Sequence, residues 1–478
     1  MGLFSRLRGG MRIKLRFFGA ARSVTGSRFC VEVNGLRVLI DCGLYQEREL
    51  RDRNWEKFPV SPGDIDAVLL THAHLDHCGL LPKLVKEGFR GRIHCTAATA
   101  EIARIILLDS AHIQEEDAEH KRKRHEREGR KGAHPDVPLY TTADADAVTP
   151  LFSPVDYGEP VDLGAGVTAK FCDAGHVFGS STITLTAQTD GQTRRILFSG
   201  DVGRKDKPIL DDPDAAGEAD YVLVESTYGD RVHEPTENVE GQLAEIINTA
   251  VEAGGNIVIP SFALERSQEL LYHLNELLIA DRIPHLVTFL DSPMAIRITK
   301  VFDEHPELFD EEMARRMKAE MSPFDFPGLK MTMSTAESKA INRIKGSAVI
   351  IAGSGMCTGG RIKHHLVQNI SRPECTVLFV GYQAEGTLGR HIVAGSREVR
   401  IHGEKRQVLA RVEQVHGFSA HADRDELVSW LSGLKSPPRQ VFVVHGEEAA
   451  ALAFRDYLTD KTGWPASAPN YLDEVTLD

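Results

Sequence analysis

Residues 71–79 read THAHLDHCG and place three histidines and an aspartate within six residues, directly after the apolar run AVLL. These side chains are His72, His74, Asp76 and His77. Groups so close together compete for the same few hydrogen-bond partners, and burying polar groups without partners is costly. The alternative, a surface loop of solvated side chains, is disfavoured by the buried strand that precedes the motif. The stretch therefore predicts a metal site at the end of a buried strand.

Other apolar runs end in the same way. Four to six β-branched and aliphatic residues, bounded by Gly or Asp, predict buried strands. The residues that follow these runs can bind metal or transfer protons: Asp41 in RVLID, His176 in VTAKFCDAGH, Asp201 in RRILFSGD, Glu225 in DYVLVES and His445 in RQVFVVHGE. Helical patterns lie between the strands at 79–89, 98–108 and 238–255. This order predicts a layered α/β fold.

A second α/β block runs from about residue 230 to residue 412. Its predicted strands are as apolar as those of the first block, so we expect a core of its own. They lie at 255–262, 285–292, 346–355 and 375–382, with a helix at 264–280. The length of 478 residues also predicts two or three domains.

Composition narrows the class of protein. With 42% hydrophobic and 26% charged residues, the chain reads as globular. No apolar run approaches the ~18 residues of a membrane span, and the basic N-terminus lacks the apolar core of a signal peptide. We therefore expect a cytoplasmic protein with no membrane contact. The seven cysteines form no CxxC pair, which disfavours a disulfide framework and a thiolate zinc site.

Charge is distributed unevenly. The net charge of −13 excludes a basic coat for nucleic acid, yet residues 121–131 hold seven Lys or Arg. A solvated helix or mobile loop is the favoured interpretation of such a run. An RNA-contacting arm is the alternative, and the sequence does not decide between them.

The side chains of the opening motif can supply ligands for two metal ions. Two-metal hydrolysis of a phosphodiester needs two ligand sets about 3.5–4 Å apart and a carboxylate between them. His72 and His74 project to one side of an extended turn, and Asp76 and His77 can reach a second ion. Asp201 is the candidate bridge. Nitrogen and oxygen ligands fit Zn²⁺ best, although Mn²⁺ or Fe²⁺ suits the same cage.

The motif HxHxDHxG, together with LIDCG, DAGH and SGD, resembles the metallo-β-lactamase superfamily. ESTYGD, GFSAHAD and VVHGE resemble the three added motifs of the β-CASP nucleases, which include RNA 3′-end-processing endonucleases and RNase J. The resemblance covers the chain from about Met11, an alternative start, so residues 1–10 are a possible extension. It implies an αββα sandwich at 1–229 and 413–478, with a β-CASP domain inserted at 230–412.

The resemblance also implies a role for each site residue. It assigns the first metal to His72, His74 and His176, the second to Asp76, His77 and His445, and the bridge to Asp201. Asp76 counts among the catalytic residues as well. The remaining implied roles are a carboxylate that orients a ligand histidine (Asp41), a general acid (His421), a carboxylate that holds that acid (Glu225) and a hydroxyl that binds the scissile phosphate (Ser419).

The implied activity is zinc-dependent hydrolysis of single-stranded RNA, by an endonuclease in RNA processing or decay; trimming from a 5′ end stays open. A histidine at the position of His445 is associated with RNA substrates in this family. A homodimer is a further implication of the resemblance. Two alternatives differ in class: a small-molecule zinc phosphodiesterase or thioesterase, and an inactive scaffold. The scaffold is disfavoured because every metal ligand is present.

Overall fold

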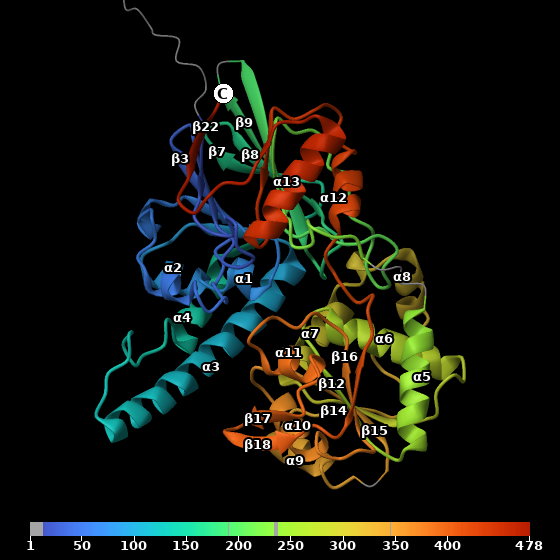
Figure 1. Cartoon of the computed structure of the whole chain (residues 1–478). Helices are drawn as coiled ribbons and strands as arrows, with labels where there is room; N and C mark the ends of the chain where they lie inside the picture. Colours follow the sequence, from blue (N-terminus) through green and yellow to red (C-terminus); the bar gives the residue numbers. More distant parts are fainter. Residues whose placement is uncertain (1–12, 190, 234–237, 345) are drawn as a thin grey trace, which may run out of the picture. The chain divides into compact units, whose positions relative to one another are not determined.

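The computed structural model describes residues 13–189, 191–233, 238–344 and 346–478. The chain forms two compact units. The first, here the sandwich unit, comprises Met1–Lys205, Asp212–Val232 and His421–Asp478, and the second, the inserted unit, comprises Asp206–Asp211 and His233–Ala420. The predicted layered α/β architecture is confirmed in both units (Figure 1). The exact domain boundaries 230 and 412 stay a prediction.

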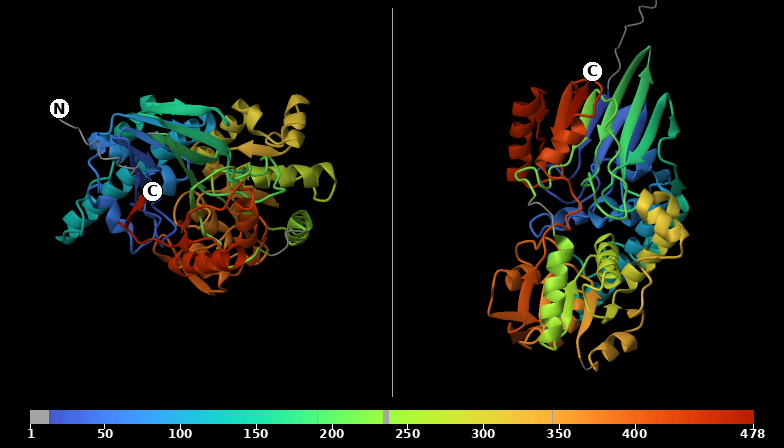
Figure 2. Two further views of the ribbon diagram at one scale, coloured as in Figure 1. Left: turned by 90° about the horizontal axis from the view of Figure 1, so that it is seen from above. Right: turned by 90° about the vertical axis from the view of Figure 1, so that its right-hand side faces the viewer.

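Two sheets of seven strands form the centre of the sandwich unit. The strand order of the first is β22 (Glu474–Leu477), β1 (Ile13–Phe17), β2 (Phe29–Val33), β3 (Leu36–Ile40), β4 (Ala67–Leu69), β5 (Arg92–Cys95) and β6 (Phe152–Pro154). The order of the second is β21 (Ala466–Ser467), β20 (Gln440–Val443), β11 (Tyr221–Val224), β10 (Gln192–Phe198), β9 (Ser181–Thr189), β8 (Val167–Asp173) and β7 (Pro160–Gly164). The hairpin of β9 and β10 lies beside the carboxyl terminus (Figure 2), where Arg194 Nε donates to the Asp478 carbonyl at 2.7 Å.

The core of the sandwich unit lies between these sheets. Buried side chains of both sheets form one cluster, which includes Leu15, Val31, Phe171, Phe198 and Phe442. Strands that alternate buried and half-buried residues, such as β1, turn their apolar face toward this cluster. Removing so many large side chains from water stabilises the stacked sheets.

Helices cover the sheets. A second cluster packs α12 (Arg424–Leu431) and α13 (Glu448–Thr462) against the other face of β11 and β20. The helices that follow strands of the first sheet are α1 (Leu75–Cys78), α2 (Leu81–Lys86), α3 (Ala97–Glu128) and α4 (Thr142–Asp146). Short 3₁₀ helices occur at Arg51–Trp55, Pro62–Asp64, Thr149–Leu151 and, in the inserted unit, Pro306–Leu308.

Helix α3 is far longer than predicted. The apolar periodicity predicted a helix only over 98–108, and this bound was wrong because the charged residues beyond it also favour a helix and pair along its surface, as Lys123 does with Glu119 at 2.6 Å. Thr96 caps the start by accepting a hydrogen bond from the Thr99 N–H, and Gly129 ends the helix in the left-handed conformation with φ 64°. The basic stretch is therefore helical over 121–128.

The inserted unit is built on one parallel sheet. Its strand order is β14 (Leu329–Met331), β13 (Val287–Leu290), β15 (Ala348–Ala352), β12 (Ile257–Pro260), β16 (Thr376–Phe379) and β19 (Arg411–Gln414). The helices are α5 (Val239–Glu252), α6 (Arg266–Ile279), α7 (Pro293–Glu304), α8 (Glu311–Lys318), α9 (Thr335–Ile341), α10 (Ile362–Asn369) and α11 (Leu388–Val393), and β17 (Glu398–Ile401) pairs with β18 (Glu404–Gln407). The four predicted strands are β12, β13, β15 and β16, and the predicted core of its own is present.

Among the described helices, none combines the length and the hydropathy that a membrane span requires.

Candidate active site

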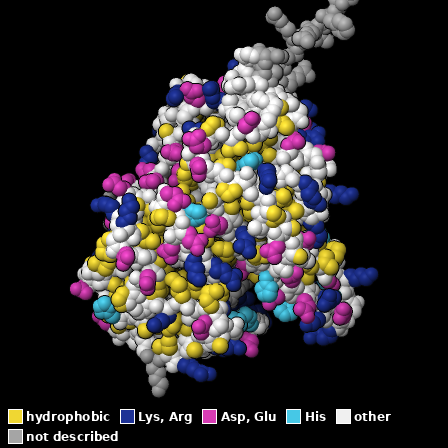
Figure 3. Space-filling view, turned by 180° about the vertical axis from the view of Figure 1, so that it is seen from behind, with side chains coloured by type: hydrophobic (Ala, Val, Ile, Leu, Met, Phe, Trp, Pro, Cys, Tyr) yellow, Lys and Arg dark blue, Asp and Glu magenta, His cyan; other side chains and the backbone are white. Residues whose placement is uncertain are grey.

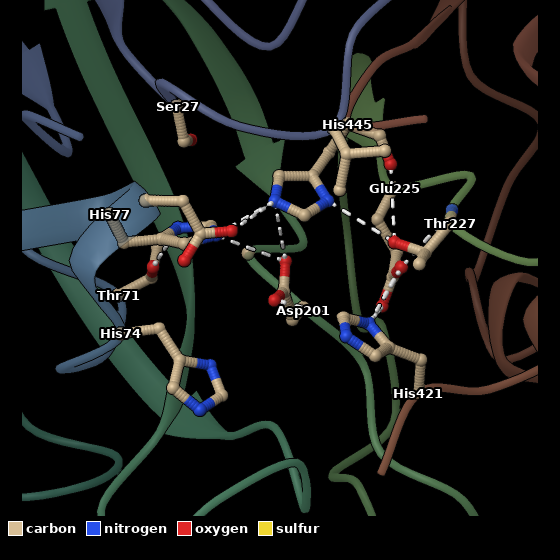
Figure 4. Close-up of polar contacts among 12 residues, drawn as sticks. Ser27, Thr71, His74, His77, Asp201, Glu225, Thr227, His421 and His445 are labelled. Carbon is tan, nitrogen blue, oxygen red and sulfur yellow. Dashed lines mark hydrogen bonds and ion pairs between the residues drawn. The ribbon is translucent and has the colours of Figure 1, made fainter. Parts of the chain in front are cut away.

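The site lies at the carboxyl ends of strands in the sandwich unit. Strands β3 and β4 run parallel and are followed by Asp41 and by the THAHLDH turn. In the second sheet β10, β11 and β20 are parallel and are followed by Asp201, Glu225 and His445. Functional groups converge where the ends of parallel strands share one edge of a sheet. Figure 4 shows His77, Asp201 and His445 turned toward one another.

Three histidines and one oxygen of Asp201 form the first group of candidate ligands. The group consists of His72, His74, His176 and Asp201, whose ligand atoms all lie within 4.8 Å of one another. Nε2 of His72 and Nε2 of His176 are each 3.4 Å from Asp201 Oδ2. Nε2 of His72 is 3.0 Å from Nδ1 of His74.

A second group of three gathers on the other side of the same carboxylate. It consists of Asp76, His77 and His445. The Nε2 atoms of His77 and His445 face each other at 3.0 Å, and His445 Nε2 is 3.5 Å from Asp76 Oδ2. Asp201 Oδ1 lies 3.3 Å from His77 Nε2 and 3.6 Å from His445 Nε2. The two oxygens of Asp201 thus face different groups, which is the geometry that a bridging ligand needs.

These contacts fit bound cations better than hydrogen bonds. Two imidazole nitrogens that face each other at 3.0 Å share at most one proton, and a cation can accept both lone pairs instead. Asp201 Oδ1 is buried and accepts no hydrogen bond from the described residues. A buried carboxylate oxygen in that state is costly without a positive partner. The donor set of nitrogen and oxygen atoms suits a divalent metal such as zinc.

Burial sets the charge of the first group. Burial lowers the pKa of His74 to about 4 and holds the pKa of His72 well below its ordinary value. Both rings are therefore neutral near pH 7, the form that binds metal. Burial opposes ionisation of Asp76, but the hydrogen bond from His445 and the charge of His77 outweigh it and lower the pKa of this carboxyl.

Asp41 fixes the orientation of His77. Its Oδ2 lies 2.7 Å from His77 Nδ1, and its Oδ1 accepts the Thr71 N–H at 2.9 Å. With Nδ1 held by this carboxylate, Nε2 of His77 is directed toward the second group. Asp41 is fully buried and adopts the left-handed backbone conformation with φ 59°, rare for a residue other than glycine.

His421 lies beside the ligand groups and contacts a different carboxylate. Its Nδ1 is 3.1 Å from both oxygens of Glu225, and 3.9 Å from Asp201 Oδ2. Glu225 is fully buried and also accepts the Val202 N–H at 2.7 Å. Burial disfavours the charged imidazole, but Glu225 and then Asp201 outweigh burial and raise the pKa of His421 to about 9. The side chain keeps 21% exposure, so a substrate can reach it.

Some positioning residues were missed by sequence reasoning. Ser27 Oγ lies 3.1 Å from Asp41 Oδ2, and Thr227 Oγ1 lies 3.2 Å from His445 Nδ1. Thr227 stands within the ESTYGD motif, but nothing in the sequence connects it to a residue 218 positions away. Ser419 is half-buried near the end of the inserted unit, two residues before His421, and its role stays a prediction.

Three family models match successive parts of the chain: the metallo-beta-lactamase superfamily at 29–235, the Beta-Casp domain at 267–392 and the Zn-dependent metallo-hydrolase RNA specificity domain at 405–469. A ribonuclease of Thermus thermophilus is 41% identical over 436 residues, which cover 91% of this chain and 94% of the relative. The chain belongs to the β-CASP family of the metallo-β-lactamase superfamily. The predicted resemblance and fold class are confirmed.

Other relatives are transcription termination factors. A transcription termination factor, FttA, of Methanocaldococcus jannaschii is 32% identical, and the match covers 98% of this chain and 73% of the relative. A solved structure of a protein of unknown function from Enterococcus faecalis has a TM-score of 0.54 at 10% identity, with 98% of this chain and 100% of that chain covered, and so supports the fold alone. The predicted enzyme class, a metal-dependent hydrolase, is confirmed by the family.

Proposed function

We propose that this β-CASP protein is a zinc-dependent ribonuclease that cuts single-stranded RNA internally, in RNA processing or decay. The observation that carries the proposal is the position of Asp201, whose two oxygens face two separate groups of candidate ligands. The RNA specificity domain model at 405–469 and the ribonuclease of Thermus thermophilus support RNA as the substrate.

Two zinc ions are part of the proposal, with Mn²⁺ or Fe²⁺ as the metals that could replace them. His72, His74 and His176 hold one ion. Asp76, His77 and His445 hold the other, and Asp201 lies between them. Divalent ions held by these residues would supply Lewis-acid chemistry, which polarises a phosphate and lowers the pKa of water. Asp41 keeps the ring of His77 in the orientation that binding requires.

His421 acts as the general acid. Glu225 holds Nδ1 of its ring, so Nε2 carries the proton that passes to the ribose oxygen when the P–O bond breaks. A ribose alkoxide is a poor leaving group, and a positioned acid contributes roughly 10²–10⁴-fold to such a step. We place Ser419 at the scissile phosphate, as the family resemblance implies.

Two further parts complete the proposal. We propose a homodimer, as the family resemblance implies, and a cytoplasmic location, which follows from the N-terminal sequence that lacks the apolar core of a signal peptide. A monomeric mass, measured by light scattering at the assay concentration, would contradict the homodimer.

A time course on a 5′-labelled single-stranded RNA and on the matching DNA tests the function. We expect internal RNA fragments from the first time points and much slower cleavage of the DNA. Release of only 5′ mononucleotides would show that the protein is a 5′ exonuclease and not an endonuclease. Hydrolysis of small phosphodiesters or thioesters without cleavage of RNA would favour the small-molecule alternative.

A further inference from the structure

The distal part of α3 forms an arm that the active site does not use. All the buried side chains of this helix lie between Ala98 and Ala118. The last ten helical residues, Glu119–Glu128, contain no buried side chain and extend about 15 Å beyond the packed part. We call residues 119–131 the arm. Figure 3 shows Lys and Arg side chains among acidic ones at the lower right, where the arm lies.

A returning segment supports the arm. His125 Nδ1 lies 2.8 Å from Asp136 Oδ2, and His134 Nε2 lies 2.6 Å from Asp52 Oδ1. The ring of His134 also stacks on Trp55, with a centroid distance of 5.1 Å and an interplanar angle of 8°. A helix without buried contacts is marginal in water. The interactions of this segment therefore help to keep the arm helical and fixed to the sandwich unit.

The arm concentrates positive charge. Lys121, Arg124 and Arg127 follow each other at intervals of three residues and share one face of the helix. Across the described residues, no carboxylate lies within 4.0 Å of Lys121 or Arg124, whereas Arg127 is 3.8 Å from Glu128. Like charges at this spacing destabilise a helix by about 0.2–0.5 kcal/mol per pair. An anionic partner removes this cost.

We propose that the arm binds the phosphate backbone of single-stranded RNA whose scissile bond lies in the active site. This inference rests on the proposed ribonuclease function. The arm reads EHKRKRHEREGRK and contains no apolar side chain. A protein partner usually needs an apolar contact core, whereas a polyanionic backbone needs only Lys and Arg. The whole chain has a net charge of −13 and therefore repels a polyanion on average. A local basic surface is needed to bind one.

The length of α3 sets the RNA length that the arm requires. Oγ1 of Thr96, at the start of the helix, donates to the Gly179 carbonyl at 2.7 Å, in the same loop as His176. Lys121–Arg127 lie 25–31 residues further along, which corresponds to about 40 Å of helix. At about 3.4 Å per phosphate along a stacked strand, an RNA must extend roughly twelve nucleotides from the cut to reach the arm.

The test compares two triple variants that remove the same charge. The arm variant carries Lys121→Gln, Arg124→Gln and Arg127→Gln. The control carries Lys435→Gln, Arg439→Gln and Lys461→Gln, three exposed residues elsewhere in the sandwich unit. Fluorescence anisotropy measures the Kd for 5-nucleotide and 30-nucleotide RNAs between 50 and 200 mM salt. The measurement uses a His421→Gln background, in which we expect cleavage to be slowed roughly 10²–10⁴-fold.

We expect the arm variant to bind the 30-nucleotide RNA about tenfold more weakly and to lower the salt slope by about 2, from three lost contacts at ~0.7 each. The Kd of the arm variant for the 5-nucleotide RNA should stay within twofold of the parent value. The Kd of the control variant should stay within twofold of the parent value for both RNAs. Glu119→Gln with Glu126→Gln should tighten binding of the long RNA. Three results would each overturn the proposal: an equal loss of affinity in both triple variants, an equal loss of affinity for both RNAs, or no loss of affinity. If no affinity is lost, an acidic protein is the partner that the arm would bind instead.

Cleavage assays separate this inference from the proposed function. If the otherwise wild-type protein cuts the 30-nucleotide RNA and the arm variant has an unchanged KM, the arm proposal fails and the ribonuclease stands. If the long RNA binds through the arm but is never cut, the arm stands and the ribonuclease proposal fails. Far-UV circular dichroism and Tm, compared among the variants, identify any loss of folding.

Discussion

His421 differs from the candidate ligand histidines in the carboxylate that it contacts. The two ligand groups contain His72, His74, His176, His77 and His445 but not His421, among the described residues. Its Nδ1 faces Glu225 at 3.1 Å, and its ring centroid is 4.4 Å from that of His176. This position supports a proton donor at the edge of the candidate metal site.

Replacing His421 should affect a poor leaving group far more than a good one. We expect His421→Gln to slow RNA cleavage roughly 10²–10⁴-fold, because a ribose oxygen must be protonated as it leaves. Hydrolysis of bis(4-nitrophenyl) phosphate, whose nitrophenolate leaves without a proton, should change only a few-fold. Zinc content by mass spectrometry should be unchanged. Equal losses on both substrates would argue that His421 acts on the metals or on binding.

The pH dependence of cleavage should report the same proton. Because the pKa of His421 is raised to about 9, the acid form is present at neutral pH and is lost as pH rises through about 9. We therefore expect kcat for RNA to fall on the alkaline side with an apparent pKa near that value. Glu225→Gln removes the largest stabilising charge, so the fall should move to lower pH. A pH profile that Glu225→Gln leaves in place would contradict the assignment.

The opening motif could be predicted from sequence because its four candidate ligands lie within six residues. His176, Asp201, Glu225 and His445 could be recognised as residues that follow apolar strands, but only the family resemblance assigned them to particular metals. Ser27 and Thr227 could not be predicted, because a hydroxyl that orients a distant side chain leaves no local pattern. The structure identifies them through contacts 14 and 218 positions apart.

At the scale of elements, turns as well as strands position the candidate ligands. His176 lies in the loop between β8 and β9, and Gly203 N donates to the Ala174 carbonyl at 2.8 Å. A Cβ atom at Gly203 would lie 1.7 Å from the Gly175 carbonyl oxygen and 2.8 Å from the His176 nitrogen. These contacts are with backbone, so the loop itself must shift to accept a side chain.

We therefore expect Gly203→Ala to displace His176 and to lose bound zinc. Metal content per chain after gel filtration measures the loss, and RNA cleavage should fall in parallel by at least about tenfold. Gly359→Ala is the matched control, because a Cβ at Gly359 meets no atom within 4 Å. Full zinc occupancy in Gly203→Ala would show that the His176 loop tolerates the change.

Strands were easier to predict than helices. Each predicted strand of the inserted unit is present. Every residue of β12, β15 and β16 is buried, and a short apolar run of this kind is a strong local signal. The extent of α3 was missed because its distal half has no apolar face to detect. Strand β19 was also missed, since none of its residues is fully buried.

At the scale of the whole chain, the insertion separates residues that meet in one site. Strand β11 pairs in parallel with β20, and this pairing brings Glu225 and His445 to the same sheet edge although they are 220 positions apart in sequence. Sequence periodicity alone does not fix which strands are neighbours over such a distance. The order of family motifs supplied that information.

Removing the metals should destabilise the protein. Without cations the facing imidazoles and Asp201 lose their partner in a buried site, and a ligand at 100 times its Kd stabilises the folded state by about 2.7 kcal/mol. For a unit of this size we expect Tm to fall by roughly 5–10 °C in excess chelator. Scanning calorimetry measures the shift, and zinc added back should reverse it. An unchanged Tm would contradict a buried site filled by metal.

Zinc titration of metal-free protein tests the two-metal ribonuclease most directly. Bound zinc per chain and the initial rate of RNA cleavage are measured on the same samples. We predict that binding saturates at two ions per chain, and that activity rises to its plateau only as the second ion binds. Full activity at one ion per chain, or in the presence of excess chelator, would contradict the account.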